Sequence, residues 1–396
     1  MSESDGEVLI DDPEAEQDDV SASEVQRAVV TSTDWTTETI LSQMRRGNIQ
    51  LNPRFQRRDA WTAKRKSLFI ESLVLGLPIP QLVLAESRDR RGSFIVLDGK
   101  QRLLTLRQFA ATEGDTFNTL RLSHLEVRPD LEGHDLESLE ADPATQDAFD
   151  AFSNQTIRTV VVRAWPDEAF LDLVFLRLNT GSVQLSPQEL RQALRPGPFT
   201  NFTDEFSADS RDLQAALRLD KPDFRMRDVE VVLRHFGFRF FLDDYRGNLK
   251  AFLDGTLEKL NASWPNQEGA LREAGSELDA AIRAAFTVFE EEAFYRFDDG
   301  KGRYERRFNR AIFDVITWYA SRSSEVRELM GRRPDDVETA FKELCADKDF
   351  RESITTTTKS VGATSTRLRM WGEALRDCGA SGIEIPVLDG GRIFIP

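Results

Sequence analysis

The 396-residue sequence predicts an α+β protein in which an α/β part is followed by a mostly helical part. Three short runs, at 82–84, 94–97 and 156–164, are apolar, are bounded by turn residues and have the composition of strands. Apolar residues at helical spacing lie between these runs and dominate after about residue 205. The chain is long enough for one large domain or two ordinary ones.

The α/β part is predicted to start near Thr33, after a tail. Residues 1–32 contain few large apolar side chains and cannot offset the entropy of ordering, so we expect a disordered acidic tail. The elements expected next are a helix through 40–44, an extended piece at 49–53, a helix through 69–74, the strands at 82–84 and 94–97, a helix through 103–109, the strand at 156–164 and a helix through 170–176. The acidic stretch at about 112–155 is interpreted as an insertion into a domain covering 33–198.

A strong helix start follows this part of the chain. Ser186 suits the N-cap position, Pro187 the first helical position, and Glu189 can return a hydrogen bond to the cap. Apolar spacing then predicts a helical domain over 199–380. The last residues, 381–396, are expected to be an extended segment or a hairpin around two adjacent glycines.

The net charge of −16 is unevenly distributed along the chain. Residues 1–30 contain ten acidic residues and one basic residue, and residues 124–152 contain nine and one. Residues 45–107, in contrast, contain fourteen basic and five acidic residues, a balance of +9. An acidic total therefore does not exclude a polyanionic ligand, because a local basic surface can still attract one.

Several classes of protein are not expected from the composition. No apolar run approaches the 18 residues of a membrane span, and the acidic N-terminus does not resemble a secretory signal, so a cytoplasmic protein without membrane contact is expected. Two cysteines and three histidines do not form a disulfide framework or a metal-ligand pattern. We find neither a G-x-S-x-G motif nor a Walker loop.

The clearest motif is Val-Leu-Asp-Gly-Lys-Gln-Arg-Leu-Leu at 96–104. A strand runs through a glycine turn directly into a helix, whose N-terminus favours anions. Lys100 and Arg102 add positive charge, and Asp98 could hold a magnesium ion through water or orient Arg102. An equally good interpretation is that Asp98 only caps the helix and that the basic side chains are solvated.

Two further segments carry polar residues in patterns that suit anion binding. Residues 52–61 read Asn-Pro-Arg-Phe-Gln-Arg-Arg-Asp-Ala-Trp, with three arginines within five residues and two aromatic residues nearby. For Gln56 and Arg57, phosphate contact and surface ion pairing are both open, whereas the aromatic residues favour a core position. Residues 175–181 read Phe-Leu-Arg-Leu-Asn-Thr-Gly, which by itself is a common helix stop.

Taken together, these segments resemble the N-terminal domain of GmrSD-type modification-dependent restriction enzymes, the former domain-of-unknown-function family 262. The resemblance implies a fold related to ParB and sulfiredoxin, and it covers roughly 33–260. The matching residues are Pro53, Phe55, Gln56, Arg57 and Trp61; Asp98, Gly99, Gln101 and Arg102; Phe175, Arg177, Leu178, Asn179, Thr180 and Gly181; and Leu185, Ser186, Glu189, Leu190 and Arg191.

The resemblance implies binding of a nucleoside triphosphate of unknown base together with magnesium, and hydrolysis coupled to DNA cleavage in phage defence. It assigns the catalytic role to Asp98, Gln101 and Arg102, with Asp98 also the metal ligand. It assigns nucleotide binding to Gln56, Arg57, Gly99, Lys100, Arg177, Asn179 and Thr180. Such a set is chemically adequate because phosphoryl transfer depends mainly on positioning and charge stabilisation.

The sequence departs from the family in two respects. Lys100 replaces the first glutamine of the box, and no histidine follows His235, so a C-terminal His-dependent nuclease is not expected. Sulfiredoxin chemistry is not expected either, since no cysteine lies near the box. DNA cutting would then need the N-terminal domain or a partner.

The first hypothesis is therefore a magnesium-dependent NTPase that acts on or senses DNA in a restriction or defence system. The second is a non-hydrolysing, NTP-gated switch of the ParB type that binds DNA or a partner. The third is a structural scaffold. DNA, a second copy of the chain and a partner protein of the defence system are the macromolecular partners considered.

Overall fold

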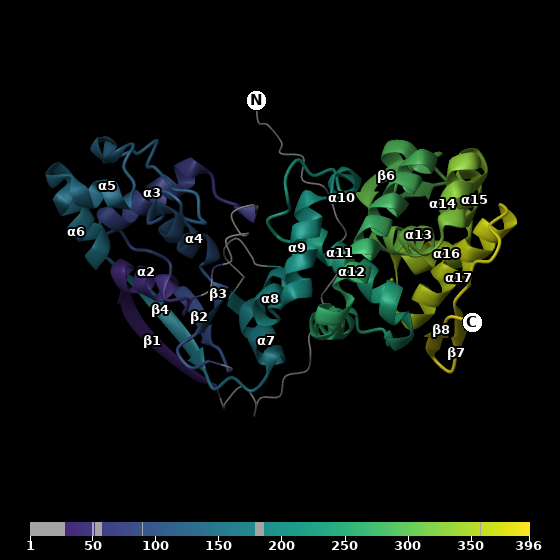
Figure 1. The fold of residues 1–396 in the computed structure, drawn as a ribbon, viewed down its shortest axis with the longest axis horizontal. Helices are drawn as coiled ribbons and strands as arrows, with labels where there is room; N and C mark the ends of the chain where they lie inside the picture. The colour runs from purple at the N-terminus through teal and green to yellow at the C-terminus, as the bar shows by residue number, and fades with distance from the viewer. Residues whose placement is uncertain (1–27, 50, 52–57, 89, 179–185, 357) are drawn as a thin grey trace. The chain divides into compact units, whose positions relative to one another are not determined.

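The computed structural model describes residues 28–49, 51, 58–88, 90–178, 186–356 and 358–396 (Figure 1). The chain divides between Leu194 and Arg195 into two compact units, where the sequence predicted a boundary after residue 198. The first unit combines helices with a four-stranded sheet and the second is mostly helical, so the expected α/β part followed by a helical part is confirmed. Within the described residues, no helix is long and apolar enough to cross a membrane.

The sheet of the first unit has the strand order β1-β4-β2-β3. The strands are β1 (Val29–Thr36), β2 (Leu82–Glu86), β3 (Phe94–Asp98) and β4 (Thr156–Arg163). β4 pairs antiparallel with β1 and parallel with β2, and β2 and β3 form an antiparallel hairpin. β2, β3 and β4 lie where the apolar runs predicted strands.

The edge strand β1 was not predicted, since residues 29–32 were assigned to the disordered tail. All eight residues of β1 pair with β4, with Val30 opposite Val162. Val29 and Val30 are nevertheless 50% and 61% exposed, so the segment carries no pattern of burial that reveals a strand. Its order comes from long-range pairing, which local composition does not encode. Residues 1–27 of the expected tail lie outside the described residues.

Helices cover both faces of this sheet, because successive strand residues point to opposite sides. Leu82, Leu84 and Val161 pack into one core, and Val83, Ala85 and Val162 pack into another. The first core is covered by α2 (Thr37–Arg45), α3 (Ala63–Val74), α4 (Lys100–Phe109), α5 (Leu136–Ala141) and α6 (Gln146–Asn154), and the second by α7 (Glu168–Leu178) and α8 (Pro187–Leu194). The strand–turn–helix motif therefore lies between two packed layers.

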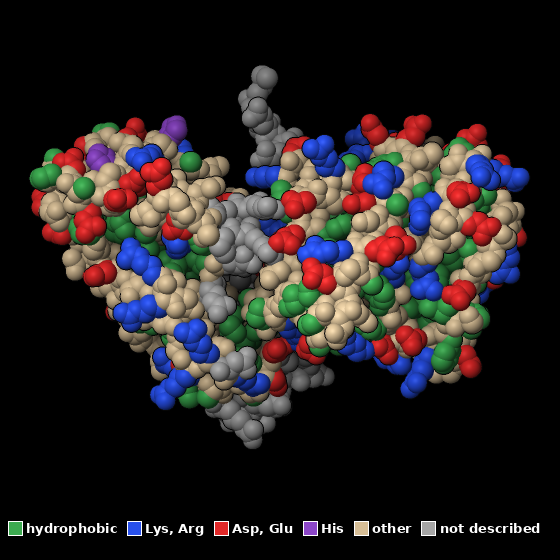
Figure 2. All heavy atoms as spheres, in the orientation of Figure 1, with side chains coloured by type: hydrophobic (Ala, Val, Ile, Leu, Met, Phe, Trp, Pro, Cys, Tyr) green, Lys and Arg blue, Asp and Glu red, His purple; other side chains and the backbone are tan. Residues whose placement is uncertain are grey.

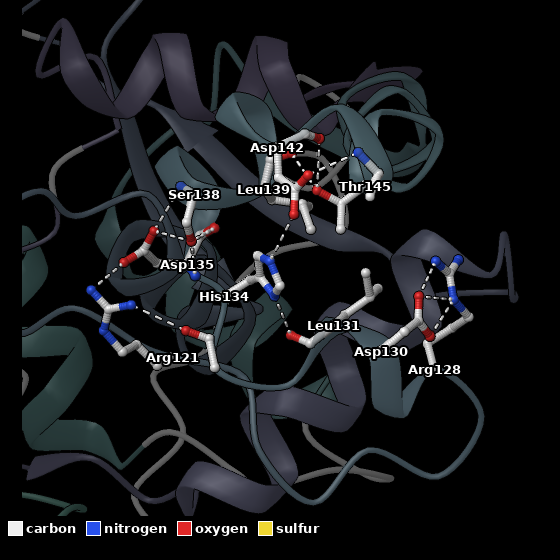
Figure 3. Close-up of polar contacts among 12 residues, drawn as sticks. Arg121, Arg128, Asp130, Leu131, His134, Asp135, Ser138, Leu139, Asp142 and Thr145 are labelled. Atoms are coloured by element: carbon white, nitrogen blue, oxygen red, sulfur yellow. Dashed lines mark hydrogen bonds and ion pairs between the residues drawn. The ribbon is translucent and has the colours of Figure 1, made fainter.

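The acidic stretch at 112–155 is an integral part of this unit, since Leu131, Leu139 and Phe152 are fully buried in the first core. Figure 3 shows the polar contacts that hold its loops. Arg121 Nη2 lies 2.9 Å from Asp135 Oδ2, and the Asp135 side chain caps α5. The acidic stretch is therefore ordered by a few buried apolar side chains and by local helix caps.

Glu71 in α3 anchors the loop that starts this stretch. Its buried carboxylate accepts hydrogen bonds from the backbone N–H groups of Glu126, Val127 and Arg128. Burial by itself raises the pKa of the Glu71 carboxyl, but the hydrogen bonds from Arg128, Val127 and Glu126 outweigh it and hold the pKa below its ordinary value. The charged form is therefore favoured by folding.

We expect Glu71→Gln to destabilise the loop by about 1–3 kcal/mol at neutral pH, because its amide NH₂ group meets backbone donors. A lowered folded-state pKa means that the carboxylate contributes fully above the unfolded-state pKa, about 4.3, and loses its contribution as the pH falls through the folded-state value. Hydrogen-exchange protection of the amides at 126–128 measures this loss. Glu137→Gln, at an exposed site in α5, is the control, and equal protection in wild type and Glu71→Gln would contradict the anchor role.

The second unit packs its helices around one long helix, α12. Its helices are α9 (Pro198–Asp209), α10 (Arg211–Ala216), α11 (Arg227–Phe241), α12 (Leu249–Phe289), α13 (Arg310–Arg322), α14 (Ser324–Arg332), α15 (Pro334–Ala346), α16 (Lys348–Thr355) and α17 (Val361–Asp377). An unpredicted hairpin, β5 (Tyr295–Asp298) and β6 (Arg303–Phe308), interrupts the helices. A second, β7 (Val387–Asp389) and β8 (Arg392–Phe394), lies near the C-terminus.

Charged side chains lie in the core of this helical unit. Arg234 of α11 and Asp314 of α13 form a buried ion pair, with Arg234 Nε 3.2 Å from Asp314 Oδ1. Arg367 of α17 is 1% exposed, and its Nη2 lies 4.0 Å from Asp314 Oδ2. The neighbouring His235 is also buried, which lowers its pKa to about 3 and keeps it neutral at pH 7.

Candidate functional site

The β3–α4 turn, residues 98–102, contains the motif that sequence analysis singled out. Asp98 ends β3, Gly99 has a left-handed backbone conformation with φ +96°, and Lys100 begins α4. A Cβ atom at Gly99 would lie 2.3 Å from Leu82 Cδ2 and 3.2 Å from Arg102 Nη2. Glycine is therefore required at position 99 for two reasons. Its φ angle is unfavourable for other residues, and a side chain there would clash with Leu82 and crowd Arg102.

Asp98 and Arg102 hold each other in place across this turn. Asp98 Oδ1 accepts a hydrogen bond from the Gly99 N–H at 2.7 Å, and Asp98 Oδ2 accepts one from Arg102 Nη2 at 3.1 Å. Arg102 Nη2 also donates to the Gln81 carbonyl oxygen at 3.0 Å. The Arg102 side chain is 10% exposed, so the guanidinium is fixed at the turn with little freedom to move.

Two polar atoms of the turn have no hydrogen-bond partner among the described residues. They are Arg102 Nε, a donor, and Gln101 Oε1, an acceptor, and both are buried. A buried polar atom without a partner costs about 1–3 kcal/mol. Such atoms are commonly satisfied by water or a ligand, so a donor and an acceptor of the same turn are each available to a polar molecule.

Lys100 connects the turn to α8. Its Nζ lies 2.7 Å from Glu189 Oε1, and both side chains are less than a tenth exposed. Glu189 Oε2 accepts a hydrogen bond from the Ser186 N–H at 2.8 Å, while Ser186 Oγ accepts one from the Glu189 N–H at 3.1 Å. The predicted capping box is thus present, and its glutamate also binds the lysine that replaces the family's glutamine.

A second polar cluster lies where the described chain resumes after residues 52–57. Lys66 of α3 is buried and forms an ion pair with Asp59, and its Nζ donates to Gln108 Oε1 of α4 at 2.6 Å. Trp61 packs edge-on against Phe69 at 5.6 Å between ring centroids, as the core interpretation of this aromatic residue expected. The segment that follows the predicted Gln-Arg pair is therefore held against α4.

The sequence analysis did not identify Lys66 and Gln108 as members of a polar cluster, although the spacing of polar residues in α4 indicated one for Gln108. Gln101, Thr105 and Gln108 are spaced at i, i+4 and i+7, so they share one face of α4. Thr105 and Gln108 are buried despite being polar. Buried polar side chains on one face of a helix indicate a specific set of hydrogen-bond partners.

Of the other residues predicted to bind the nucleotide, the structure describes only some. Gln56, Arg57, Asn179 and Thr180 lie outside the described residues. Arg177 is exposed at the C-terminal end of α7. The structure thus brings together Asp98, Gly99, Lys100, Gln101 and Arg102 in one turn, joined to Glu189.

The donor set fits a phosphate ligand with a magnesium ion better than a metal centre of the protein's own. No cluster of three or more His, Cys, Asp or Glu side chains suitable for a metal ion occurs in the described part of the chain. Asp98 offers one carboxylate at the turn, next to a fixed guanidinium. Magnesium bound to a nucleotide commonly takes only one or two protein carboxylates, with phosphate and water as its other ligands.

Comparison with known proteins identifies the segment that contains this turn. Residues 37–195 match the family model described as the N-terminal domain of GmrSD restriction endonuclease. No curated protein and no solved structure was found to match the chain. The matched segment includes α2 to α8 and strands β2, β3 and β4. The match over residues 37–195 supports the resemblance of this segment to the N-terminal domain of GmrSD restriction endonuclease that the sequence predicted.

Proposed function

We propose that the β3–α4 turn binds a nucleoside triphosphate with magnesium and that the protein hydrolyses it while acting on DNA in a restriction or anti-phage defence system. The observation that carries the proposal is the pair of buried, unpartnered atoms Arg102 Nε and Gln101 Oε1, which lie in the family's motif. A ParB-like fold of this unit, which the resemblance of the sequence implies, is part of the proposal.

Each side chain of the turn has a role that its contacts support. Arg102, oriented by Asp98, would donate to a phosphate oxygen and stabilise the charge that builds up during transfer. Gln101 Oε1 would accept a hydrogen bond from the attacking water and so orient it. The N-terminus of α4 adds backbone N–H groups that favour anions. Asp98 would hold the magnesium ion, which would supply positive charge to offset part of the charge of the phosphates.

A non-hydrolysing switch is the second candidate, and one contact favours it. The family's box has a glutamine where this chain has Lys100, and the lysine ammonium is bound to Glu189. An amide at this position could help to orient water, whereas an ion-paired ammonium cannot accept a hydrogen bond. In this version the nucleotide would change the conformation of the turn without being turned over.

Phosphate release and thermal shift separate these functions. The full-length protein is incubated with magnesium and each common nucleoside triphosphate, with and without duplex DNA. Phosphate release with multiple turnovers supports the NTPase. A nucleotide-dependent rise in Tm without turnover supports the switch, and neither signal with any nucleotide would reject both.

A further inference from the structure

The surface charge of the first unit is strongly asymmetric. Figure 2 shows Asp and Glu side chains gathered over α5 and α6, and Lys and Arg side chains gathered over the sheet. The exposed acids of these two helices are Glu137, Glu140, Asp147 and Asp150. An asymmetric charge distribution of this kind orients a charged partner before contact is made.

Four exposed arginines form what we call the arginine patch: Arg45, Arg46, Arg90 and Arg91. Arg45 and Arg46 lie at the C-terminal end of α2, and Arg90 and Arg91 lie in the turn between β2 and β3.

Backbone pairing brings these two segments together. The Phe94 N–H donates to the Asn48 carbonyl oxygen at 2.6 Å, and Ile49 forms a parallel bridge with Phe94. Arg90 Nη2 also contacts Asn48 Oδ1 at 3.4 Å. The patch is therefore a property of the fold rather than of one basic run.

The positive charge of the patch is not neutralised by acids of the described chain. Arg45, Arg46 and Arg91 form no ion pair with a described residue, and the contact of Arg90 is with a neutral amide. Two arginines of β4, in contrast, are paired with acids. Arg158 Nη1 lies 3.5 Å from Asp34 Oδ1, and Arg163 Nε lies 3.3 Å from Glu86 Oε2. Unpaired like charges repel one another, and a polyanion relieves this repulsion.

We propose that the arginine patch binds the phosphate backbone of double-stranded DNA, independently of base sequence. Guanidinium groups match phosphate oxygens in a bidentate geometry. No Phe, Tyr or Trp in the described part of residues 28–194 is among the exposed side chains, so the surface offers no stacking platform for single strands. The proposal rests on DNA as the partner of the proposed function, but it is independent of the nucleotide site.

The salt dependence of DNA binding tests this surface. Affinity of the full-length protein for a short labelled duplex is measured without nucleotide between about 50 and 200 mM salt. The variant R45Q/R46Q/R90Q/R91Q is expected to lower the slope of log affinity against log salt by about 0.9 for each phosphate that the protein no longer neutralises, or roughly 3 to 4 in all. The variant R45K/R46K/R90K/R91K retains the charge and is expected to keep most of the slope.

The control removes the same number of charges from the helical unit. R303Q/R306Q/R332Q/R369Q changes four exposed arginines there and is expected to leave the slope nearly unchanged. An equal loss in both glutamine variants would show a general charge effect and overturn the proposal, as would an unchanged slope in the patch variant. Loss of binding to phosphatidylserine vesicles without loss of DNA binding would assign the patch to a membrane surface and also overturn it.

The same variants distinguish failure of this inference from failure of the proposed function. The nucleotide-dependent thermal shift of R45Q/R46Q/R90Q/R91Q should equal that of the wild type, since none of the four arginines belongs to the β3–α4 turn. Because the DNA measurement contains no nucleotide, its result stands even if no nucleotide binds.

Discussion

Arg102→Ala is expected to weaken nucleotide binding by about a hundredfold or more while leaving the first unit folded. Arg102 is fixed by Asp98 and the Gln81 carbonyl oxygen, so its buried Nε is preorganised to meet a phosphate oxygen. Alanine removes this donor and leaves the anion without its nearest fixed positive charge. Titration with a fluorescent nucleotide gives the affinity, and thermal unfolding gives the stability.

Arg107→Ala is the matched control because Arg107 lies on the same helix. Its Nη2 pairs with Asp115 Oδ2 at 2.7 Å, away from the β3–α4 turn. Its loss should affect stability as much as the loss of Arg102, but not nucleotide affinity. Wild-type affinity in both Arg102→Ala and Asp98→Ala would mean that the motif is only a helix start.

Asp98→Asn separates the two roles proposed for this carboxylate. If Asp98 only orients Arg102, the variant weakens nucleotide binding without changing the magnesium concentration that gives half-maximal binding. If Asp98 also ligates magnesium, that concentration rises, because an amide oxygen is a weaker ligand for a hard cation. A magnesium titration of wild type and variant distinguishes the two results.

The second large effect is expected in the helical unit, where Asp314→Ala should lower the free energy of unfolding by about 3–5 kcal/mol. Arg234 and Arg367 both lie next to Asp314 and are almost fully buried. Burial, with a smaller effect from Arg234, lowers the pKa of Arg367 to about 10, and Asp314 opposes that shift. Removing the carboxylate leaves two buried guanidinium groups without their shared counter-charge.

Urea unfolding with an exposed ion pair as the control measures this cost. Asp336→Ala removes a carboxylate that lies 3.9 Å from Arg333 at the surface, and is expected to change stability by less than about 1 kcal/mol. Replacing Arg234 and Asp314 together by apolar residues should recover part of the loss. Equal stability of Asp314→Ala and wild type would show that the buried charges are compensated by water.

Much of the fold could be predicted because its signals are local. α2, α3 and α4 lie where apolar residues recur at helical spacing, and α8 begins at the predicted capping box. Each of these signals depends on side chains within one or two turns of the chain. Their physical basis is burial of one helix face and satisfaction of the first N–H groups.

The elements that were missed depend on partners far along the chain. β1 is ordered by pairing with a strand more than a hundred residues away, and its residues show no alternation of buried and exposed side chains. The β5–β6 hairpin lies between two long helices in a region whose average composition is helical. In both cases hydrogen-bond pairing between strands outweighed local preference.

The sequence by itself determined the positions of β2, β3 and β4, the glycine turn that joins β3 to α4, and the resemblance of residues 37–195 to a known family. Only the tertiary structure decided the contacts of the charged side chains. Lys100, for which phosphate contact and solvation were both open, binds Glu189, 89 residues away. The two segments that carry the arginines of the patch are brought together because Phe94 of β3 pairs with Ile49, which follows α2. Turns and helix starts depend on residues that are neighbours in the sequence. The ion-pair partner of a charged side chain, in contrast, depends on which elements pack next to it in the folded protein.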